Sequence, residues 1–319
     1  MALSVVVPVY NGAATLPELI TRLRDVLPST CGEYELILVN DGSRDASWQT
    51  ILELAGNFPE VRAFNLMRNY GQHNAILCGI RAARHDVVVT LDDDLQHPPE
   101  EIPKLLDKLA EGFDVVYGTP AKEEHDFWRM VASRITKLAL RTAMGAETAL
   151  QVSAFRAFRT PIRDAFEQYR GTFVCIDVLL TWGTSRFTSI RVNHLPRPAG
   201  ASNYTVRKLI RHAMNMVTGF SVVPLQLASL IGFSLTLFGL ILLAYVIGRY
   251  LIQGVTVPGF AFLASVVIIF SGAQLFALGI IGEYLARIHF RVMDRPPYVV
   301  RELQSGPAVS LDETVRERV

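Results

Sequence analysis

Two long stretches without charged residues constrain the fold of this chain more than any other feature. No charged residue lies between His212 and Arg249, and none lies between Arg249 and Glu283. A helix needs about 20 consecutive apolar residues to cross a bilayer, so we expect two membrane-spanning helices over residues 225–248 and 260–282. Two buried core helices are the alternative, but uninterrupted apolar runs of this length disfavour it.

Basic residues indicate how the two expected helices are oriented. They gather before the first helix and after the second, at Arg207, Lys208, Arg211, Arg287, Arg291 and Arg295, whereas only Arg249 lies near the connecting turn. The positive-inside rule therefore predicts an inner (plasma) membrane protein with both termini in the cytoplasm. Three widely spaced cysteines agree with a reducing compartment. A net charge of +1 gives no case for nucleic acid as a partner.

Strand and helix patterns alternate over residues 1–193. Apolar, β-branched runs predict strands, and amphipathic segments between them predict helices. The expected strands are Ser4–Val9, Glu35–Asn40, Val61–Leu66, Asp86–Leu91 and Asp114–Tyr117, and the expected helices are Leu16–Val26, Ala46–Leu54, Asn74–Ala83 and Glu100–Ala110. This alternation predicts an α/β domain with a mostly parallel sheet covered on both faces.

Polar clusters follow three of these strands. They are Tyr10-Asn11-Gly12, Asn40-Asp41-Gly42-Ser43 and Asp92-Asp93-Asp94. The carboxyl ends of parallel strands share one edge of a sheet, where ligands bind, so the three clusters together predict a nucleotide site. Carboxylates at this spacing suit Mg²⁺ or Mn²⁺. For the Asp triplet alone, a solvated acidic turn before the helix that Pro98 opens is the alternative.

The ordered motifs carry a resemblance to a known family. Pro8–Asn11, Val39–Ser43, Arg68–Ala75 and Leu91–Gln96 occur in this order, and Gly282–Arg287 and Arg295–Tyr298 follow the second apolar stretch. Together they resemble family 2 glycosyltransferases that have a GT-A domain and charge polyprenyl phosphate with a sugar. The similarity covers residues 1 to about 303. It is greatest to a bacterial branch with two spans, which includes undecaprenyl-phosphate glucosyltransferases and the aminoarabinose transferase; dolichyl-phosphate mannose synthase is a further relative.

The resemblance implies roles for residues of the nucleotide site. Asp41 corresponds to the carboxylate that receives the base or ribose, although it also fits an Asx turn with Gly42. The other implied donor-binding residues are Pro8, Tyr10, Asn11, Arg68, Asp92 and Asp93. The implied ligands of a Mg²⁺ or Mn²⁺ ion on the donor diphosphate are Asp92, Asp94 and Gln96.

The same resemblance implies catalytic roles for Asp94, Arg156, Arg197 and Ser202, with both arginines near the lipid phosphate. Four positions depart from the family pattern. Gly12 stands where Glu is usual, Asp93 where a smaller residue is usual, Ala154 where Asp is usual, and Asn203 where Lys is common. A phosphate monoester is already ionised near neutral pH, so loss of the Asp at position 154 does not remove an obligatory base.

We therefore expect inverting transfer of a sugar, with a UDP-hexose favoured as donor, to undecaprenyl or decaprenyl phosphate for modification of cell-envelope glycans. Transfer to the hydroxyl group of a diacylglycerol-type lipid is one alternative. A catalytically inactive membrane scaffold is another. The branch that the chain resembles also implies a homo-oligomer, with a tetramer as the weak expectation.

The expected organisation has four parts. A cytosolic glycosyltransferase domain spans residues 1–193, an acceptor-phosphate loop with an interfacial helix 194–220, the two membrane helices 221–287, and a cytosolic tail 288–319. Helical spacing of apolar and basic residues predicts that two segments, His125–Met144 and Thr205–Gly219, lie on the membrane surface. The polar sequence after Leu303 is typical of disorder.

Overall fold

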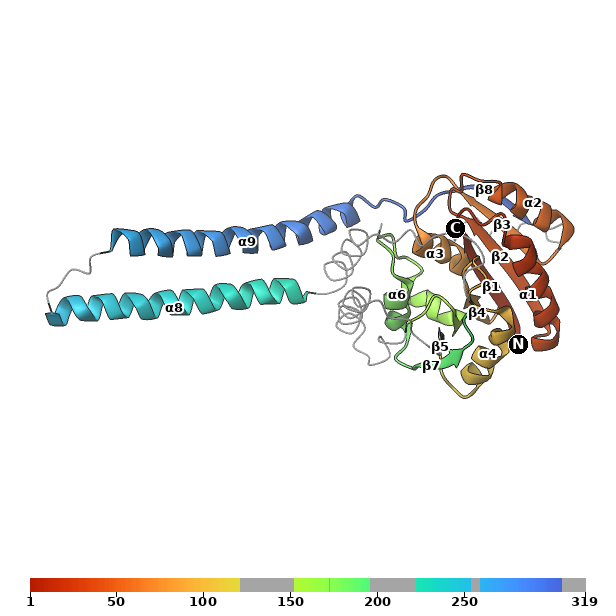
Figure 1. Cartoon of the computed structure of the whole chain (residues 1–319), viewed down its shortest axis with the longest axis horizontal. Coiled ribbons are helices and arrows are strands. Elements are labelled where there is room, and N and C mark those ends of the chain that lie inside the picture. The colour runs from red at the N-terminus through yellow and green to blue at the C-terminus, as the bar shows by residue number, and fades with distance from the viewer. Residues whose placement is uncertain (121–151, 172, 196–221, 254–258, 306–319) are drawn as a thin grey trace.

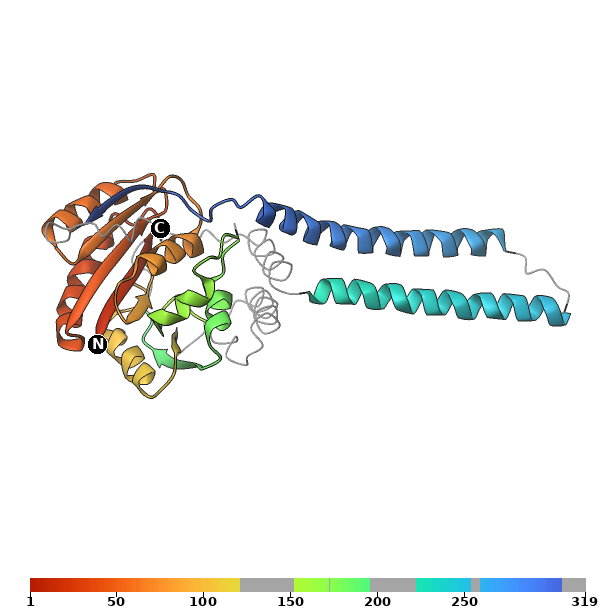
Figure 2. The same ribbon diagram turned by 180° about the vertical axis from the view of Figure 1, so that it is seen from behind.

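The computed structural model of the protein describes residues 1–120, 152–171, 173–195, 222–253 and 259–305. These residues form an α/β domain, from which two long antiparallel helices extend (Figure 1; Figure 2). The expected surface segments, His125–Met144 and Thr205–Gly219, lie outside the described residues, as do Arg197 and Ser202.

An eight-stranded sheet forms the centre of the domain, in the order β7-β5-β6-β4-β1-β2-β3-β8. The strands β1 to β5 and β7 run in one direction, while β6 and β8 run antiparallel to their neighbours. The expected mostly parallel sheet is therefore confirmed. The strands are β1 (Ala2–Val9), β2 (Glu33–Asn40), β3 (Val61–Leu66), β4 (Val87–Thr90), β5 (Val115–Pro120), β6 (Arg156–Arg159), β7 (Phe187–Val192) and β8 (Val300–Ser305).

Helices cover both faces of the sheet. One face packs against α1 (Leu16–Thr30), α2 (Ser47–Asn57) and α4 (Ile102–Ala110), which follows the short 3-10 helix Pro99–Glu101. The other face packs against α3 (Gln72–Ala82), the 3-10 helix Thr160–Phe166 and α6 (Ile176–Gly183). In β1, Val5 and Val7 enter the first core while Val6 enters the second. Burial on both faces explains why β1 carries a run of consecutive valines, Val5 to Val7.

The chain returns to the sheet after the two long helices. Strand β8 pairs antiparallel with β3, whereas the sequence predicts a cytosolic tail over residues 288–319 without a strand. Tyr298, just before β8, is 3% exposed, and its ring lies 5.7 Å from the guanidinium carbon of Arg81. Arg301 donates a hydrogen bond to the carbonyl oxygen of Met67 at 3.1 Å. The domain is therefore joined to the helices on both sides, by the chain before α8 and by β8.

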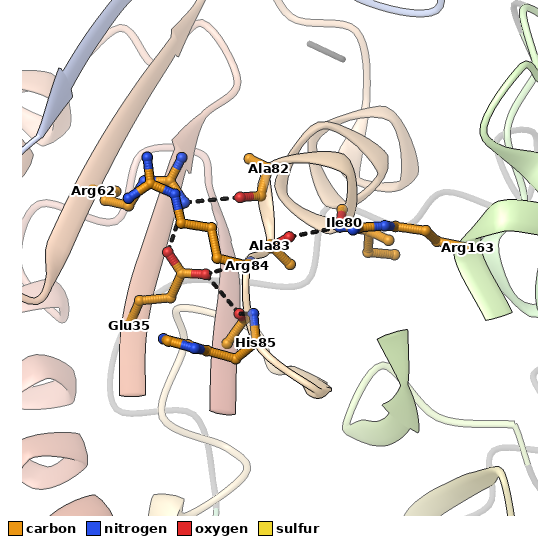
Figure 3. A network of polar contacts seen from close by, with 9 residues as sticks. Glu35, Arg62, Ile80, Ala82, Ala83, Arg84, His85 and Arg163 are labelled. Carbon is orange, nitrogen blue, oxygen red and sulfur yellow. Dashed lines mark hydrogen bonds and ion pairs between the residues drawn. The ribbon is translucent and has the colours of Figure 1, made fainter. Parts of the chain in front are cut away.

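A buried ion pair lies near the amino ends of β2 and β3 (Figure 3). Arg62 Nη1 is 2.6 Å from Glu35 Oε2 and also donates to the carbonyl oxygen of Ala82 at 2.8 Å. Arg163 donates to the carbonyl oxygen of Ala83 at 2.6 Å. The two arginines thus satisfy carbonyl groups at the C-terminal end of α3, which such a helix end leaves without partners. This network holds the end of α3 that lies away from the cavity described below.

The two long helices are α8 (Val223–Gln253) and α9 (Phe260–Val292). Each has a stretch long and apolar enough to cross a membrane, Val223–Ile252 in α8 and Ile269–Val292 in α9, and neither stretch is buried inside the structure. The helices contact one another and run antiparallel (Figure 1; Figure 2). The start of α8 and the end of α9, which lead to the domain, therefore lie at the same end of the hairpin (Figure 1; Figure 2).

Candidate active site

A cavity of about 240 Å³ lies at the carboxyl edge of the sheet. Its walls come from the ends of β1, β2 and β4 and from the loop that leads into α3. The lining residues are Pro8, Val9, Tyr10, Asp41, Asn69, Gly71, Gln72, Asp92 and Asp93. The three polar strand ends singled out in the sequence therefore meet in one place, and Asp41, Asp92 and Asp93 face the same space.

Asp41 holds the loop before α3. Its Oδ1 accepts a hydrogen bond from the N–H of Tyr70 at 2.7 Å, and its Oδ2 accepts one from the N–H of Gly71 at 2.8 Å. Burial raises the pKa of the Asp41 carboxyl above its usual value, against the opposing effect of these two N–H groups. Gly42 turns the chain with a φ of +64°, and a Cβ there would lie 3.2 Å from the Cα of Arg68. The side chain of Arg68 stacks over Tyr70, 4.7 Å from the ring centroid.

Asn11, in the motif Pro8–Asn11, connects the loops after β1 and β2 by hydrogen bonds. The N–H of Asn11 donates to Ser43 Oγ at 3.0 Å, and Asn11 Oδ1 accepts from the N–H of Arg44 at 2.8 Å. Asn11 has a φ of 56°, which Asn tolerates better than most residues. Tyr10 is 47% exposed beside the cavity. Of the expected donor-binding residues, Asn11 and Arg68 thus shape the loops, whereas Pro8, Tyr10, Asp41, Asp92 and Asp93 line the cavity.

The acidic triplet follows β4 directly. Asp92 Oδ1 accepts a hydrogen bond from Gln72 Nε2 at 2.5 Å, and Asp94 Oδ1 accepts one from the N–H of Gln96 at 3.1 Å. Between these last two residues the chain turns at Leu95, which has a φ of 59°.

The pKa of the Asp93 carboxyl is raised above its usual value. Burial, together with the charges of Asp92 and Asp94, raises the pKa of Asp93 to about 7. Consecutive carboxylates offer the oxygen ligands that a hard cation such as Mg²⁺ or Mn²⁺ prefers. Asp92, Asp94 and Gln96 are the expected ligands of that ion.

Arg156 is buried away from the cavity wall. It is 2% exposed, and its guanidinium pairs with Asp177 of α6. Tyr117 donates a hydrogen bond from its phenolic O–H to the same carboxylate at 3.1 Å. The sequence analysis expects Arg156 near the lipid phosphate but does not identify its partners, because Asp177 and Tyr117 lie in segments without a motif.

His73, Cys175 and Asp177 form a second group of metal-type side chains, with ligand atoms within 4.8 Å of one another. Burial raises the pKa of the Cys175 thiol to about 12, and Asp177 is neutralised by Arg156. A carboxylate oxygen of Asp177 in this group is therefore already engaged by Arg156. Four cavity residues were not singled out individually from the sequence, although all lie in its motifs: Val9 in Pro8–Asn11, and Asn69, Gly71 and Gln72 in Arg68–Ala75.

Residues 4–170, more than half of the chain, match the glycosyl transferase family 2. An α/β sheet with an acidic cavity at its carboxyl edge agrees with that match. The chain belongs to glycosyl transferase family 2.

Similar proteins cover nearly the whole chain. The undecaprenyl-phosphate 4-deoxy-4-formamido-L-arabinose transferase of Pseudomonas fluorescens (strain SBW25) is 37% identical over 96% of this chain and 91% of its own length. The protein of the same name from Shewanella sediminis (strain HAW-EB3) is 38% identical over 96% of this chain and 93% of its own. Among solved structures, S. aureus TarS 1-349 in complex with UDP is 16% identical, with a TM-score of 0.48 over 68% of this chain and 64% of that one.

Proposed function

We propose that this protein transfers 4-deoxy-4-formamido-L-arabinose from a nucleotide donor to undecaprenyl phosphate at the cytoplasmic face of the inner membrane. The observation that carries the proposal is the acidic cavity on a domain that is joined at both ends to a hairpin of membrane-type helices. The names of relatives that match nearly the whole chain support the sugar and the lipid. Those names do not support the UDP-hexose favoured by the sequence analysis, and the formamido-pentose replaces it here.

The donor occupies the cavity in this proposal. Pro8, Tyr10 and Asp41 contact the nucleoside, because they form the wall at the ends of β1 and β2. The diphosphate lies beside Asp92, which lines the cavity after β4 and is close in sequence to Asp94. These two residues and Gln96 would hold a Mg²⁺ or Mn²⁺ ion, which when bound supplies positive charge to the departing diphosphate. Gln72 orients Asp92 through its 2.5 Å hydrogen bond.

The reaction is a single displacement. An oxygen of the lipid phosphate attacks the anomeric carbon of the sugar, the bond from that carbon to the donor diphosphate breaks, and the nucleoside diphosphate leaves with the electron pair. The anomeric centre is inverted. The attacking phosphate is already ionised near neutral pH, so the chain's contribution is to place the two substrates in line. Ala154, beside β4 through the Thr90 Oγ1 hydrogen bond to its carbonyl oxygen at 2.7 Å, offers no base.

The lipid phosphate has two proposed partners, Arg197 and Ser202, which precede α8 in the sequence. For Arg156 we propose a positioning role in place of the expected phosphate contact. Its guanidinium is already paired with Asp177, and a buried pair is costly to open. Through Tyr117 and Asp177 it fixes β5 and α6 against β6.

The test is transfer by the purified full-length chain in detergent. UDP-4-deoxy-4-formamido-L-arabinose and UDP-glucose are each incubated with undecaprenyl phosphate or diacylglycerol, with Mg²⁺ or Mn²⁺. We expect an acid-labile glycolipid from the formamido-pentose donor and undecaprenyl phosphate. Asp94→Asn should remove the product, while Asp107→Asn, at an exposed position on α4, should not.

Other products would contradict the proposal in different ways. Product from UDP-glucose alone would return the donor to a hexose. Product on diacylglycerol alone would change the acceptor class. UDP binding without any transfer would favour an inactive scaffold.

A further inference from the structure

Gly12 and Asp93 come from the loops after two neighbouring strands, β1 and β4, and they meet beside the cavity. A Cβ added to Gly12 would lie 2.9 Å from Cγ of Asp93 and closer still to Oδ2. The optimal separation of two non-bonded carbon atoms is about 3.5–4.0 Å. The carboxylate of Asp93 therefore occupies the space that any side chain at position 12 would need.

The backbone at Gly12 is held in place. Its N–H donates to Ser47 Oγ at 2.9 Å, and its carbonyl oxygen accepts from the N–H groups of Thr15 at 3.1 Å and Leu16 at 3.2 Å, where α1 begins. The side chain of Asp93 is the partner that can move, and its Oδ2 accepts a hydrogen bond from the N–H of Tyr10 at 3.3 Å. A side chain at position 12 would thus push the carboxylate out of its place without a collision against backbone.

We propose that Gly12 and Asp93 act as one specificity-determining unit of the donor site. Gly12 keeps open the space from which the Asp93 carboxylate accepts a hydrogen bond from an O–H or N–H group on the nucleoside part of the donor. A carboxyl oxygen can accept such a hydrogen bond. The nucleoside is the relevant part because the carboxylate of Asp93 accepts a hydrogen bond from the N–H of Tyr10 at 3.3 Å, and Tyr10 contacts the nucleoside in the proposed function. This inference rests on the proposed function, because it takes the cavity to be the donor site.

The contact also connects two departures noted in the sequence. Gly12 stands where the resembling family usually has Glu, and Asp93 stands where that family usually has a smaller residue. The two exchanges are sterically linked, since the acid at position 93 fits only when position 12 has no side chain. The family pattern has a carboxylate in the loop after β1, at position 12. This chain has one in the loop after β4 instead, at Asp93, which lines the cavity.

The experiment is a mutant cycle read out by UDP binding, measured by titration calorimetry on the full-length chain in detergent with Mg²⁺. Asp93→Ala should weaken UDP binding about tenfold, the effect of one lost hydrogen bond to a charged group. Gly12→Ala should weaken it to a similar degree, because it displaces the same carboxylate. The double variant G12A/D93A should bind no more weakly than Asp93→Ala alone, since contacting residues are not additive.

A second double variant places a carboxylate at position 12 and removes the one at position 93. G12E/D93A should bind UDP within about threefold of the unchanged protein, and more tightly than either single substitution, Gly12→Glu or Asp93→Ala. Gly32→Ala and Gly32→Glu are the matched controls, because a Cβ at Gly32 meets nothing within 4 Å. They should leave UDP affinity and the thermal unfolding midpoint unchanged, which separates the contact from the general effect of replacing a glycine.

Additive losses in G12A/D93A would overturn the inference, as would unchanged UDP affinity in Gly12→Ala. Failure of the unchanged protein to bind UDP would overturn it as well. The transfer assay is independent of this readout. A protein that binds UDP with the expected cycle but transfers no sugar to undecaprenyl phosphate would contradict the proposed acceptor and leave the Gly12–Asp93 unit supported.

Discussion

Asp177 of α6 pairs with Arg156 of β6 inside the domain, where the two side chains are 7% and 2% exposed. Removing one partner of such a pair leaves an uncompensated buried charge, which costs about 3–5 kcal/mol. Asp177→Ala should therefore lower the free energy of unfolding by about 3–5 kcal/mol, measured by denaturant unfolding of the full chain in detergent. The loss includes the acceptor of the Tyr117 hydrogen bond.

The matched control replaces both members of the pair. Arg156→Met combined with Asp177→Leu leaves apolar side chains in place of both charges and should recover most of the lost stability. Asp164→Ala, at an exposed position on the 3-10 helix Thr160–Phe166, should change stability little. If the double variant were as unstable as Asp177→Ala, the ion pair would not be the source of the effect. Unchanged transfer activity in the double variant would exclude Arg156 from the lipid phosphate.

Asp41 is expected to combine a structural and a binding role. Asp41→Ala leaves the N–H groups of Tyr70 and Gly71 without their acceptor, and an unsatisfied buried donor costs about 1–3 kcal/mol. The same change removes a carboxylate from the cavity wall, so UDP affinity should fall about tenfold or more. Thermal unfolding and UDP titration on the same sample measure the two effects. A loss of stability with unchanged affinity would restrict Asp41 to holding the loop; Asp107→Ala is the exposed control.

The first five strands were predictable because burial on both faces gives each a mainly apolar run, which in β3 is interrupted by Arg62 and Asn65. Strand β6 is four residues long and has an arginine at each end, Arg156 and Arg159, so it has no such run. Strand β8 is equally polar, and its pairing with β3 joins Arg301 to Met67 across 234 residues that include both long helices. No local pattern specifies a contact of that range. The five strands predicted from the sequence are thus β1 to β5, whereas the antiparallel strands β6 and β8 and the parallel edge strand β7 were not predicted.

The site shows the same division. Asp41, Asp92 and Asp93 could be placed together from the sequence, because the carboxyl ends of parallel strands share an edge. The pairing of Arg156 with Asp177 could not, since it depends on how α6 packs on the sheet. The contact of Gly12 with Asp93 could not be predicted from the sequence either. Each residue stood out as a departure from the family pattern, but only the distance between them connects the two.

Tyr298 is predicted to hold the returning chain on the domain. It is 3% exposed, its hydroxyl lies 3.4 Å from Arg81 Nη1, and it precedes the strand that pairs with β3. Tyr298→Ala should cost about 3–5 kcal/mol, as is usual for truncating a large buried aromatic side chain. Tyr298→Phe removes the hydroxyl alone and should cost about 0.5–1.5 kcal/mol. Denaturant unfolding measures both, and equal losses for the two variants would show that ring burial contributes nothing.

Dependence on a divalent cation is the remaining prediction. Asp92, Asp93 and Asp94 follow β4 in succession, and the pKa of Asp93, raised to about 7 by burial and by its two neighbours, marks the negative field they create. Chelation by EDTA should therefore abolish sugar transfer, and added Mg²⁺ or Mn²⁺ should restore it.

Asp94→Asn keeps the shape of the side chain and removes its charge, so it should lower kcat by about 10²–10³-fold, as loss of one transition-state stabiliser commonly does. Transfer of labelled sugar to undecaprenyl phosphate is the measurement, with Asp107→Asn as the exposed control. Full activity in EDTA, together with full activity of Asp94→Asn, would mean that the triplet acts without a metal ion. In that case the leaving diphosphate would have to be stabilised by cationic side chains of the protein.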